Sequence, residues 1–148
     1  MPVTDPDTGG AALLSYGELF ARYKKKHGPL VEPVQGFDSL HEDLWLAYSL
    51  GRRRGFTDLG TYAKKPGDHG YYPAWAFDLG RNNRFFNKGW NYLVARRLAL
   101  FYVANYRALN VEYVILGRRL WSRAKPYWHP LTTGDTSHDW HLHVSGHH

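Results

Sequence analysis

The carboxyl-terminal stretch of the chain concentrates residues that can bind a metal and transfer protons. Three histidines and one aspartate fall within six residues of the segment SHDWHLHVS, which spans residues 137–145. In a β-strand alternate side chains share a face, so the pattern predicts that Asp139, His141 and His143 point the same way. The apolar residues between them would face a core. Neutral imidazole binds zinc and a nearby carboxylate or second histidine can move protons, so this stretch predicts a metal site with acid–base chemistry.

A metal site in this chain must be built from histidine, aspartate and glutamate, because the chain has no cysteine. A zinc site of that kind usually takes three protein ligands and leaves one position for water. We expect His143 as one ligand and Asp78 as the second, because the strand face of Asp78 otherwise carries only alanines, which leave room for a metal and a substrate. His69, in the preceding loop, is the third. His141 lies beside His143 and is interpreted as a base or transition-state stabiliser.

Composition and charge restrict the class of protein. The chain has 148 residues, 43% of them hydrophobic and 16% aromatic, which predicts one globular domain over residues 1–148 with a loose leader at 1–12. A net charge of +6 favours an anionic partner such as nucleic acid, anionic lipid or a cell-wall polymer. The lack of cysteine excludes disulfides and a cysteine nucleophile. No apolar run is long enough to span a membrane, and the acidic, proline-rich start lacks the pattern of a secretory signal.

Hydrophobic periodicity and turn residues predict helices and strands that are segregated rather than alternating. The expected helices span residues 13–26, 40–54 and 90–106. The expected strands span residues 56–62, 73–79, 112–120 and 137–145. The second helix would be capped by Ser39, with Glu42 completing a capping box. We therefore expect an α+β domain, in which a small antiparallel sheet carries the site and helices pack on one side.

Three segments, in this order along the chain, resemble the zinc D-Ala-D-Ala carboxypeptidase and endopeptidase group, which is related to the hedgehog-like and lysostaphin-like enzymes. The segments are GYYPAWAFDLG at 70–80, EYVILGRRLWS at 112–122 and HDWHLHVS at 138–145. The likeness covers roughly residues 56–145 and is strongest to the actinobacterial and actinophage branch. It implies the fold of that group.

The resemblance also implies roles for individual residues. Its zinc ligands correspond to His69, Asp78 and His143. It implies a catalytic role for His141, assisted by Asp139 or His138. The separation of His69 from Asp78 is longer than is usual in the group, so residues 71–73 must bulge outward if His69 is to reach the metal.

The function implied is zinc-dependent hydrolysis of an amide bond in the stem peptides or cross-links of bacterial peptidoglycan, by a phage endolysin or its catalytic domain. Such a protein would be monomeric, would be made in the host cytoplasm without a signal peptide, and would act on the cell wall. Lys64 and Lys65 are the cations nearest to the first ligand and are the candidates for holding a substrate carboxylate. Tyr72 and Trp128 are candidate cleft walls. Carboxypeptidase, L-Ala-D-Glu endopeptidase and cross-bridge endopeptidase activities all stay open.

Two other classes of function compete with this interpretation. A zinc-containing but inactive wall-binding module would share the ligands and lack the catalytic residues. A basic nucleic-acid-binding domain would account for the charge and the aromatic residues. The basic residues are, however, scattered at the ends of helices and no nucleic-acid-binding motif is present, so we expect no nucleic-acid partner. Taken singly, Asp78 could cap a turn and His69 could be a surface histidine.

Overall fold

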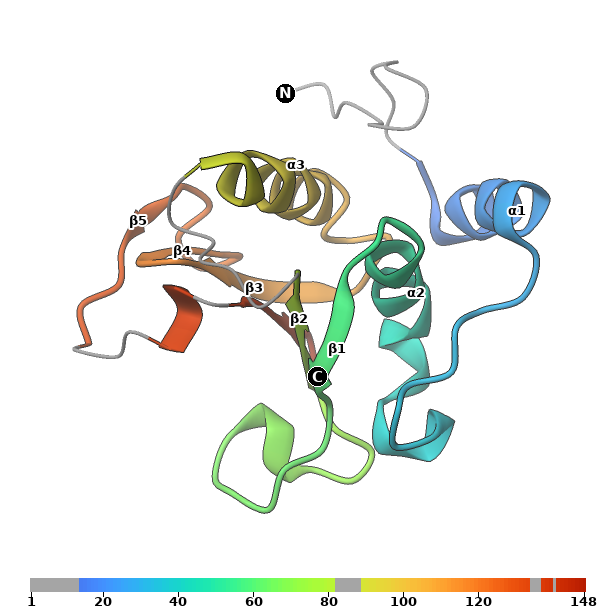
Figure 1. Ribbon diagram of the computed structural model, residues 1–148, viewed down its shortest axis with the longest axis horizontal. Coiled ribbons are helices and arrows are strands. Elements are labelled where there is room, and N and C mark those ends of the chain that lie inside the picture. The colour runs from blue at the N-terminus through green and yellow to red at the C-terminus, as the bar shows by residue number, and fades with distance from the viewer. Residues whose placement is uncertain (1–13, 82–88, 134–136, 140) are drawn as a thin grey trace.

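The computed structural model describes residues 14–81, 89–133, 137–139 and 141–148, and its described part is an α+β structure with three α-helices and a six-stranded antiparallel sheet (Figure 1). The helices are α1 (Tyr16–His27), α2 (Trp45–Arg53) and α3 (Gly89–Ala104). The strands are β1 (Thr57–Gly60), β2 (Ala76–Gly80), β3 (Val111–Leu116), β4 (Arg119–Ser122), β5 (His129–Pro130) and β6 (Leu142–Gly146). This confirms the predicted α+β class with an antiparallel sheet. Within these ranges no helix has the length and apolar character needed to cross a membrane.

The last strand of the chain lies in the middle of the sheet. The strand order is β1-β2-β6-β3-β4-β5, so β6 pairs with β2 on one side and with β3 on the other. Across this centre the Cα of His143 is opposite Asp78 in β2 and Ile115 in β3. Two residues further along, Ser145 is opposite Ala76 and Tyr113. Paired residues in neighbouring strands point to the same face, so β6 carries His143 to the face on which Asp78 lies.

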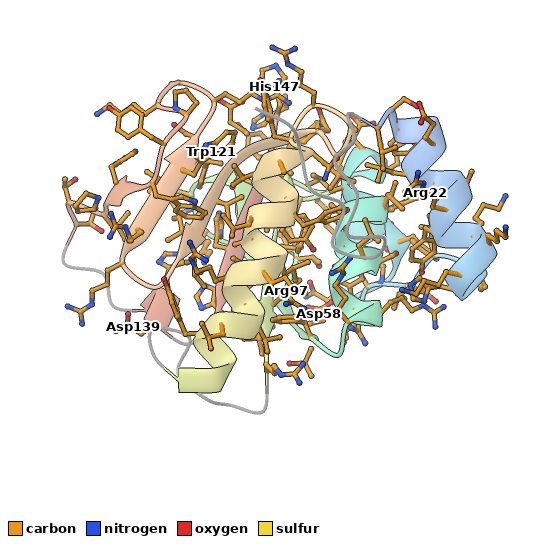
Figure 2. The ribbon with its side chains drawn as sticks, turned by 90° about the horizontal axis from the view of Figure 1, so that it is seen from above. Arg22, Asp58, Arg97, Trp121, Asp139 and His147 are labelled. Atoms are coloured by element: carbon orange, nitrogen blue, oxygen red, sulfur yellow. The ribbon has the colours of Figure 1, made fainter. Side chains whose placement is uncertain are left out.

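The two faces of the sheet have different roles. Alternate apolar residues of the three central strands belong to one buried cluster with the helices, among them Phe77, Leu79, Val114, Leu116, Leu142 and Val144. In Figure 1, α3 lies above the sheet and α2 beside it, and Figure 2 shows α3 in front of the strands when the molecule is seen from above. The loop between β1 and β2 lies on the opposite side of the sheet from α3 (Figure 1). Asp78 and His143 therefore face away from the helical layer.

The start of α2 differs from the prediction. The helix begins at Trp45, after two short 3₁₀ turns at Phe37–Ser39 and Glu42–Leu44. Ser39 does not cap it, because the Ser39 hydroxyl is buried and bonded to the Gly36 carbonyl oxygen at 2.7 Å and to the Thr61 hydroxyl at 2.8 Å. The Ser39 hydroxyl, which the local sequence pattern predicts as a helix cap, is therefore used in hydrogen bonds elsewhere in the fold.

Two of the predicted strands are also interrupted. The segment expected as one strand at 112–120 is a hairpin of β3 and β4, which turns at Gly117 with φ of 61°, a value that favours glycine. The final strand is shorter than predicted, because Ser137–Asp139 forms a 3₁₀ turn, η4, before β6 begins. The prediction that Asp139 shares a strand face with His143 is therefore wrong.

Packing of α3 on the sheet can be tested with one substitution made at two positions of the same helix. Leu98 is 1% exposed and belongs to the core cluster, so Leu98→Ala should lower the free energy of unfolding by about 2–5 kcal/mol. Leu93 is 57% exposed, so Leu93→Ala should change it by less than about 0.5 kcal/mol. Urea denaturation followed by circular dichroism measures both. Equal losses would contradict this placement of α3.

Candidate metal centre

The register of β2 and β6 brings the first two predicted ligands together. Asp78 and His143 are cross-strand partners, and the His143 Nδ1 atom lies 2.9 Å from the Asp78 Oδ1 atom. The neighbours of Asp78 on its face include Ala76, whose small side chain leaves space beside the carboxylate. Side-chain alternation in two adjacent strands is thus sufficient to build this half of the site.

A short turn in the β1–β2 loop supplies the third predicted ligand. The 3₁₀ turn η3 (Asp68–Gly70) is held by backbone hydrogen bonds from Ala63 N to His69 O at 2.8 Å and from Trp75 N to Asp68 O at 2.9 Å. His69 is buried, with its Nε2 atom 3.3 Å from Asp78 Oδ2 and 3.3 Å from His143 Nδ1. Between this turn and β2, Tyr71 is 52% exposed, so the additional residues do bulge outward while His69 reaches the site.

The three residues form a group that could hold a metal ion. Each of His69, Asp78 and His143 offers one ligand atom, and these three atoms lie within 4.8 Å of one another. The remaining ring nitrogens are already engaged, since His69 Nδ1 lies 2.6 Å from the Thr61 carbonyl oxygen and His143 Nε2 lies 2.8 Å from the Ser145 hydroxyl. A carbonyl accepts only, so His69 Nδ1 donates and Nε2 is left to bind the metal when the ring is neutral. Such outer hydrogen bonds are typical of metal-binding histidines, so the donor set fits a metal.

Thr61 is itself fixed in position. Its side chain is buried and its hydroxyl donates to Gln35 Oε1 at 2.9 Å and contacts the Ser39 hydroxyl at 2.8 Å. The segment that precedes α2 therefore supports the backbone carbonyl that orients His69. Nothing in the sequence pattern signals this role, because it depends on a main-chain oxygen.

The electrostatics of the metal-free site follow from burial and close charge pairing. Burial would raise the pKa of the Asp78 carboxyl, but hydrogen bonds from His143 and His69 outweigh it and hold that pKa well below its usual range. Burial alone would lower the pKa of His69, whereas the hydrogen bond and the charge of Asp78 raise it above 6.5. The carboxylate is thus kept ionised, as a metal ligand must be.

Two further histidines, both from the predicted catalytic set, lie beside the ligand group. His141 Nε2 is 3.4 Å from Asp78 Oδ1, so His141 and His143 do share a face. The His138 ring, in η4, lies 4.7 Å from the His141 ring and 5.6 Å from the His143 ring, measured between centroids. Four imidazoles and one carboxylate therefore converge from the β1–β2 loop, β2, η4 and the start of β6.

Asp139 takes a different position from the one predicted. Its side chain is buried, and its Oδ2 atom accepts from Arg118 Nη2 at 3.2 Å. Its Oδ1 atom is buried without a hydrogen-bond partner among the residues that the structure describes. Figure 2 shows Asp139 and His147 far apart, towards opposite edges of the molecule. Arg118 belongs to the β3–β4 turn, so this ion pair ties η4 to the hairpin.

The four predicted substrate-binding residues differ in their exposure and in their contacts. Lys64 and Lys65 are exposed on the β1–β2 loop, and the charge of Lys65 is near enough to lower the pKa of His69. Tyr72 is 58% exposed, and its hydroxyl donates to Asp38 Oδ2 at 2.8 Å. Trp128 is partly buried and packs against the core cluster. Their roles in binding stay predictions.

Sequence reasoning missed Ser145 and Tyr113, which also face the site. Ser145 is two residues after His143 in β6, so the same alternation that placed the histidines would have placed its hydroxyl there. The Tyr113 ring stacks on the His143 ring at 5.4 Å with an interplanar angle of 22°. That neighbour comes from β3 and required knowledge of the strand order.

No protein-family model, curated protein or solved structure matches this chain.

Loss of a ligand should abolish metal binding. We expect Asp78→Ala and His143→Ala to reduce Zn²⁺ uptake to background, measured as metal per chain by elemental analysis after dialysis. His129→Ala removes a histidine from β5 and should bind as the wild type does. Retained metal in both ligand variants would show that the ion binds elsewhere.

Metal affinity should fall as the pH is lowered. Zn²⁺ can bind His69 only after the ring has lost its proton, and the pKa of this ring in the metal-free protein is raised above 6.5. Proton competition therefore begins above pH 6.5 and strengthens at lower pH. Titrations with a competing chelator between about pH 5 and 8 would measure it, and an affinity independent of pH would contradict the ligation of His69.

Proposed function

We propose that this chain is a zinc-dependent amide hydrolase that acts on the stem peptides or cross-links of bacterial peptidoglycan. The observation that carries the proposal is the convergence of His69, Asp78 and His143 around one point, with His141 immediately beside them. Two imidazoles and one carboxylate are donors that suit zinc, and three protein ligands are typical of catalytic zinc sites, which keep a fourth position open. A structural zinc site would need no extra histidine at that place.

In the proposed reaction the metal would activate the carbonyl and the water, and side chains of the protein would transfer the proton. A bound zinc ion would polarise the scissile carbonyl and lower the pKa of a bound water to about 7. His141, whose Nε2 atom is 3.4 Å from Asp78 Oδ1, would accept a proton from the attacking water and deliver it to the leaving amine. In its protonated form it would stabilise the developing oxyanion instead. His138 packs against His141 and limits the orientations of that ring.

The proposed substrate follows from the resemblance of three segments to the zinc D-Ala-D-Ala carboxypeptidase and endopeptidase group, and the proposal includes the fold of that group. The net charge of +6 suits an anionic wall polymer. Lys65, whose charge lowers the pKa of His69, is the candidate for holding a substrate carboxylate, with Lys64 beside it. The exposed ring of Tyr72 and the partly buried Trp128 would form walls of the cleft. The role of a phage endolysin, acting on the wall of the host in which it is made, is part of this proposal.

One observation favours a second function, a zinc-containing module that binds the wall without cutting it. The Asp139 carboxylate, a predicted partner in proton transfer, is tied to Arg118 instead. If His141 alone cannot move the proton, the site would hold metal and substrate without turnover. The same digestion experiment separates the two functions.

Purified peptidoglycan incubated with the zinc-loaded protein should release D-alanine or a peptide, and a chelator should suppress the release. Mass spectrometry of the products identifies the bond. Binding of one Zn²⁺ per chain with no product from several peptidoglycan types would reject hydrolysis and favour the wall-binding module.

His141→Ala should separate metal binding from catalysis. We expect this variant to keep one Zn²⁺ per chain, because His141 is outside the ligand group, and to lose activity by about 10²–10⁴-fold, the usual contribution of a general acid–base. His129→Ala again serves as the matched control. Full activity of His141→Ala would remove this residue from the mechanism.

A further inference from the structure

The carboxyl-terminal ends of α1 and α2 are joined in the fold, although the two helices are separate in the sequence. Arg53, in the last turn of α2, donates from Nε to the Tyr23 hydroxyl at 3.1 Å and from Nη2 to the Pro29 carbonyl oxygen at 3.0 Å. Figure 1 shows both helices on the side of the molecule away from β4 and β5. The last turns of the two helices carry the lysines and arginines Lys24, Lys25, Lys26, Arg52 and Arg53. Cations that are scattered in the sequence therefore lie on one surface.

Two further arginines extend this surface. Arg81 directly follows β2, and its Nη1 atom donates to the Arg54 carbonyl oxygen at 3.4 Å. The guanidinium carbon of Arg54 lies 5.1 Å from the centroid of the Phe101 ring, and that of Arg81 lies 5.8 Å from the centroid of the Phe56 ring. Such contacts orient a guanidinium and leave its charge in place. We call the surface formed by residues 24–26, 52–54 and 81 the basic end.

The helix dipoles explain only part of the charge of the basic end. Each helix carboxyl terminus carries about half a negative charge, so two termini attract about one cation, whereas the last turns carry five lysines and arginines. Arg53 contacts a phenol and a carbonyl, which are both neutral acceptors. Arg52 is linked to a carboxylate, since it donates to the Tyr48 hydroxyl, which donates to Asp58 Oδ2 at 2.7 Å. The exposed lysines of α1 and Arg53 therefore leave a surplus of positive charge at this surface.

The side chains of the basic end suit repeated phosphate groups. A guanidinium can donate two parallel hydrogen bonds to one phosphate, and lysine ammonium groups add compact positive charges. Nucleic acid offers the same phosphates, but proteins that bind single strands also use aromatic rings on which the bases stack. Phe56 and Phe101, whose rings lie under guanidinium groups, are each 2% exposed and cannot stack on a base. The basic end therefore favours a polymer that is recognised through its phosphates alone.

We propose that the basic end binds a cell-wall polymer whose units are joined by phosphodiesters, and so holds the protein on the wall. Such a polymer is anionic at every repeat and complements the surplus positive charge. Arg81 follows Asp78 by three residues, which at about 3.3 Å per residue of strand places the basic end about 10 Å along the chain from a candidate ligand. The choice of a wall polymer rests on the proposed function, whereas phosphate binding requires neither a metal nor hydrolysis.

Co-sedimentation with purified cell walls tests this proposal. Walls that contain the phosphodiester polymer are compared with the same walls after hydrofluoric acid has removed it, and a chelator in every sample prevents metal-dependent hydrolysis. We expect removal of the polymer to weaken binding by about tenfold or more, because the phosphates supply most of the affinity. Binding to intact walls should also weaken as NaCl is raised, with the logarithm of the binding constant falling linearly with the logarithm of the salt concentration.

Charge reversal at two exposed lysines tests the location of the surface. Lys24→Glu/Lys25→Glu should weaken binding to intact walls by about tenfold or more, because it places two negative charges where phosphates are held. Lys24→Arg/Lys25→Arg keeps both charges and should bind as the wild type does. Arg119→Glu/Lys125→Glu makes the same change in net charge at exposed positions in β4 and in the loop after it, and should keep most of the affinity. Circular dichroism checks that each variant is folded.

Three outcomes would overturn the proposal. Equal losses in the two charge-reversal variants would show that binding follows the net charge of the protein and not the basic end. Equal binding to walls with and without the polymer would show that the phosphates are not recognised. Tighter binding to DNA or to vesicles of anionic phospholipid than to intact walls, at equal phosphate concentration, would reject the wall polymer as the partner.

Wall binding and catalysis can be separated in these experiments. Polymer-dependent binding without any product release would support the basic end and reject the proposed hydrolysis. Product release by the zinc-loaded protein, together with unchanged wall binding in Lys24→Glu/Lys25→Glu, would support hydrolysis and overturn the role of the basic end.

Discussion

The contact between Asp78 and His143 across β2 and β6 is the interaction on which the rest of the site depends. A buried carboxylate is costly unless it is paired and hydrogen-bonded, and here the imidazoles of His143 and His69 provide that pairing. The pair also marks the register of the sheet. A slip of β6 by one residue would turn His143 towards the helices and leave Asp78 without its partner. Formation of the correct sheet and formation of the candidate metal centre are therefore one event.

One face of the sheet packs in the core, and the other face carries the candidate site. Apolar side chains of β2, β3 and β6 pack with the helices, and the alternate positions of the same strands carry the imidazoles, the carboxylate and the hydroxyls. Phe77 and Asp78 are adjacent in sequence, yet one lies in the core and the other in the site. Such a division allows the site to vary without repacking the core.

The parts of the fold that could be predicted from the sequence are those that depend on local periodicity. Alternation placed Asp78 and His143 on polar strand faces, and helical spacing predicted three helices that overlap α1, α2 and α3. Two residues whose positions were predicted wrongly are held by partners that are distant in the sequence. Ser39 bonds to Thr61 instead of capping a helix, and Asp139 pairs with Arg118 instead of entering the last strand.

The central position of β6 has a consequence for the order in which the chain can fold. β2 and β3 are neighbours of β6 but not of each other, so the sheet has no continuous centre until residues 142–146 have been made. The helices and the β3–β4 hairpin can form early from contacts that are close in sequence, whereas insertion of β6 closes a loop back to β2 and is the slow step expected of non-local pairing. During synthesis on the ribosome the three candidate ligands would meet only after residues 142–146 have been made. Before that point the chain would have no assembled centre and could not hold an ion there.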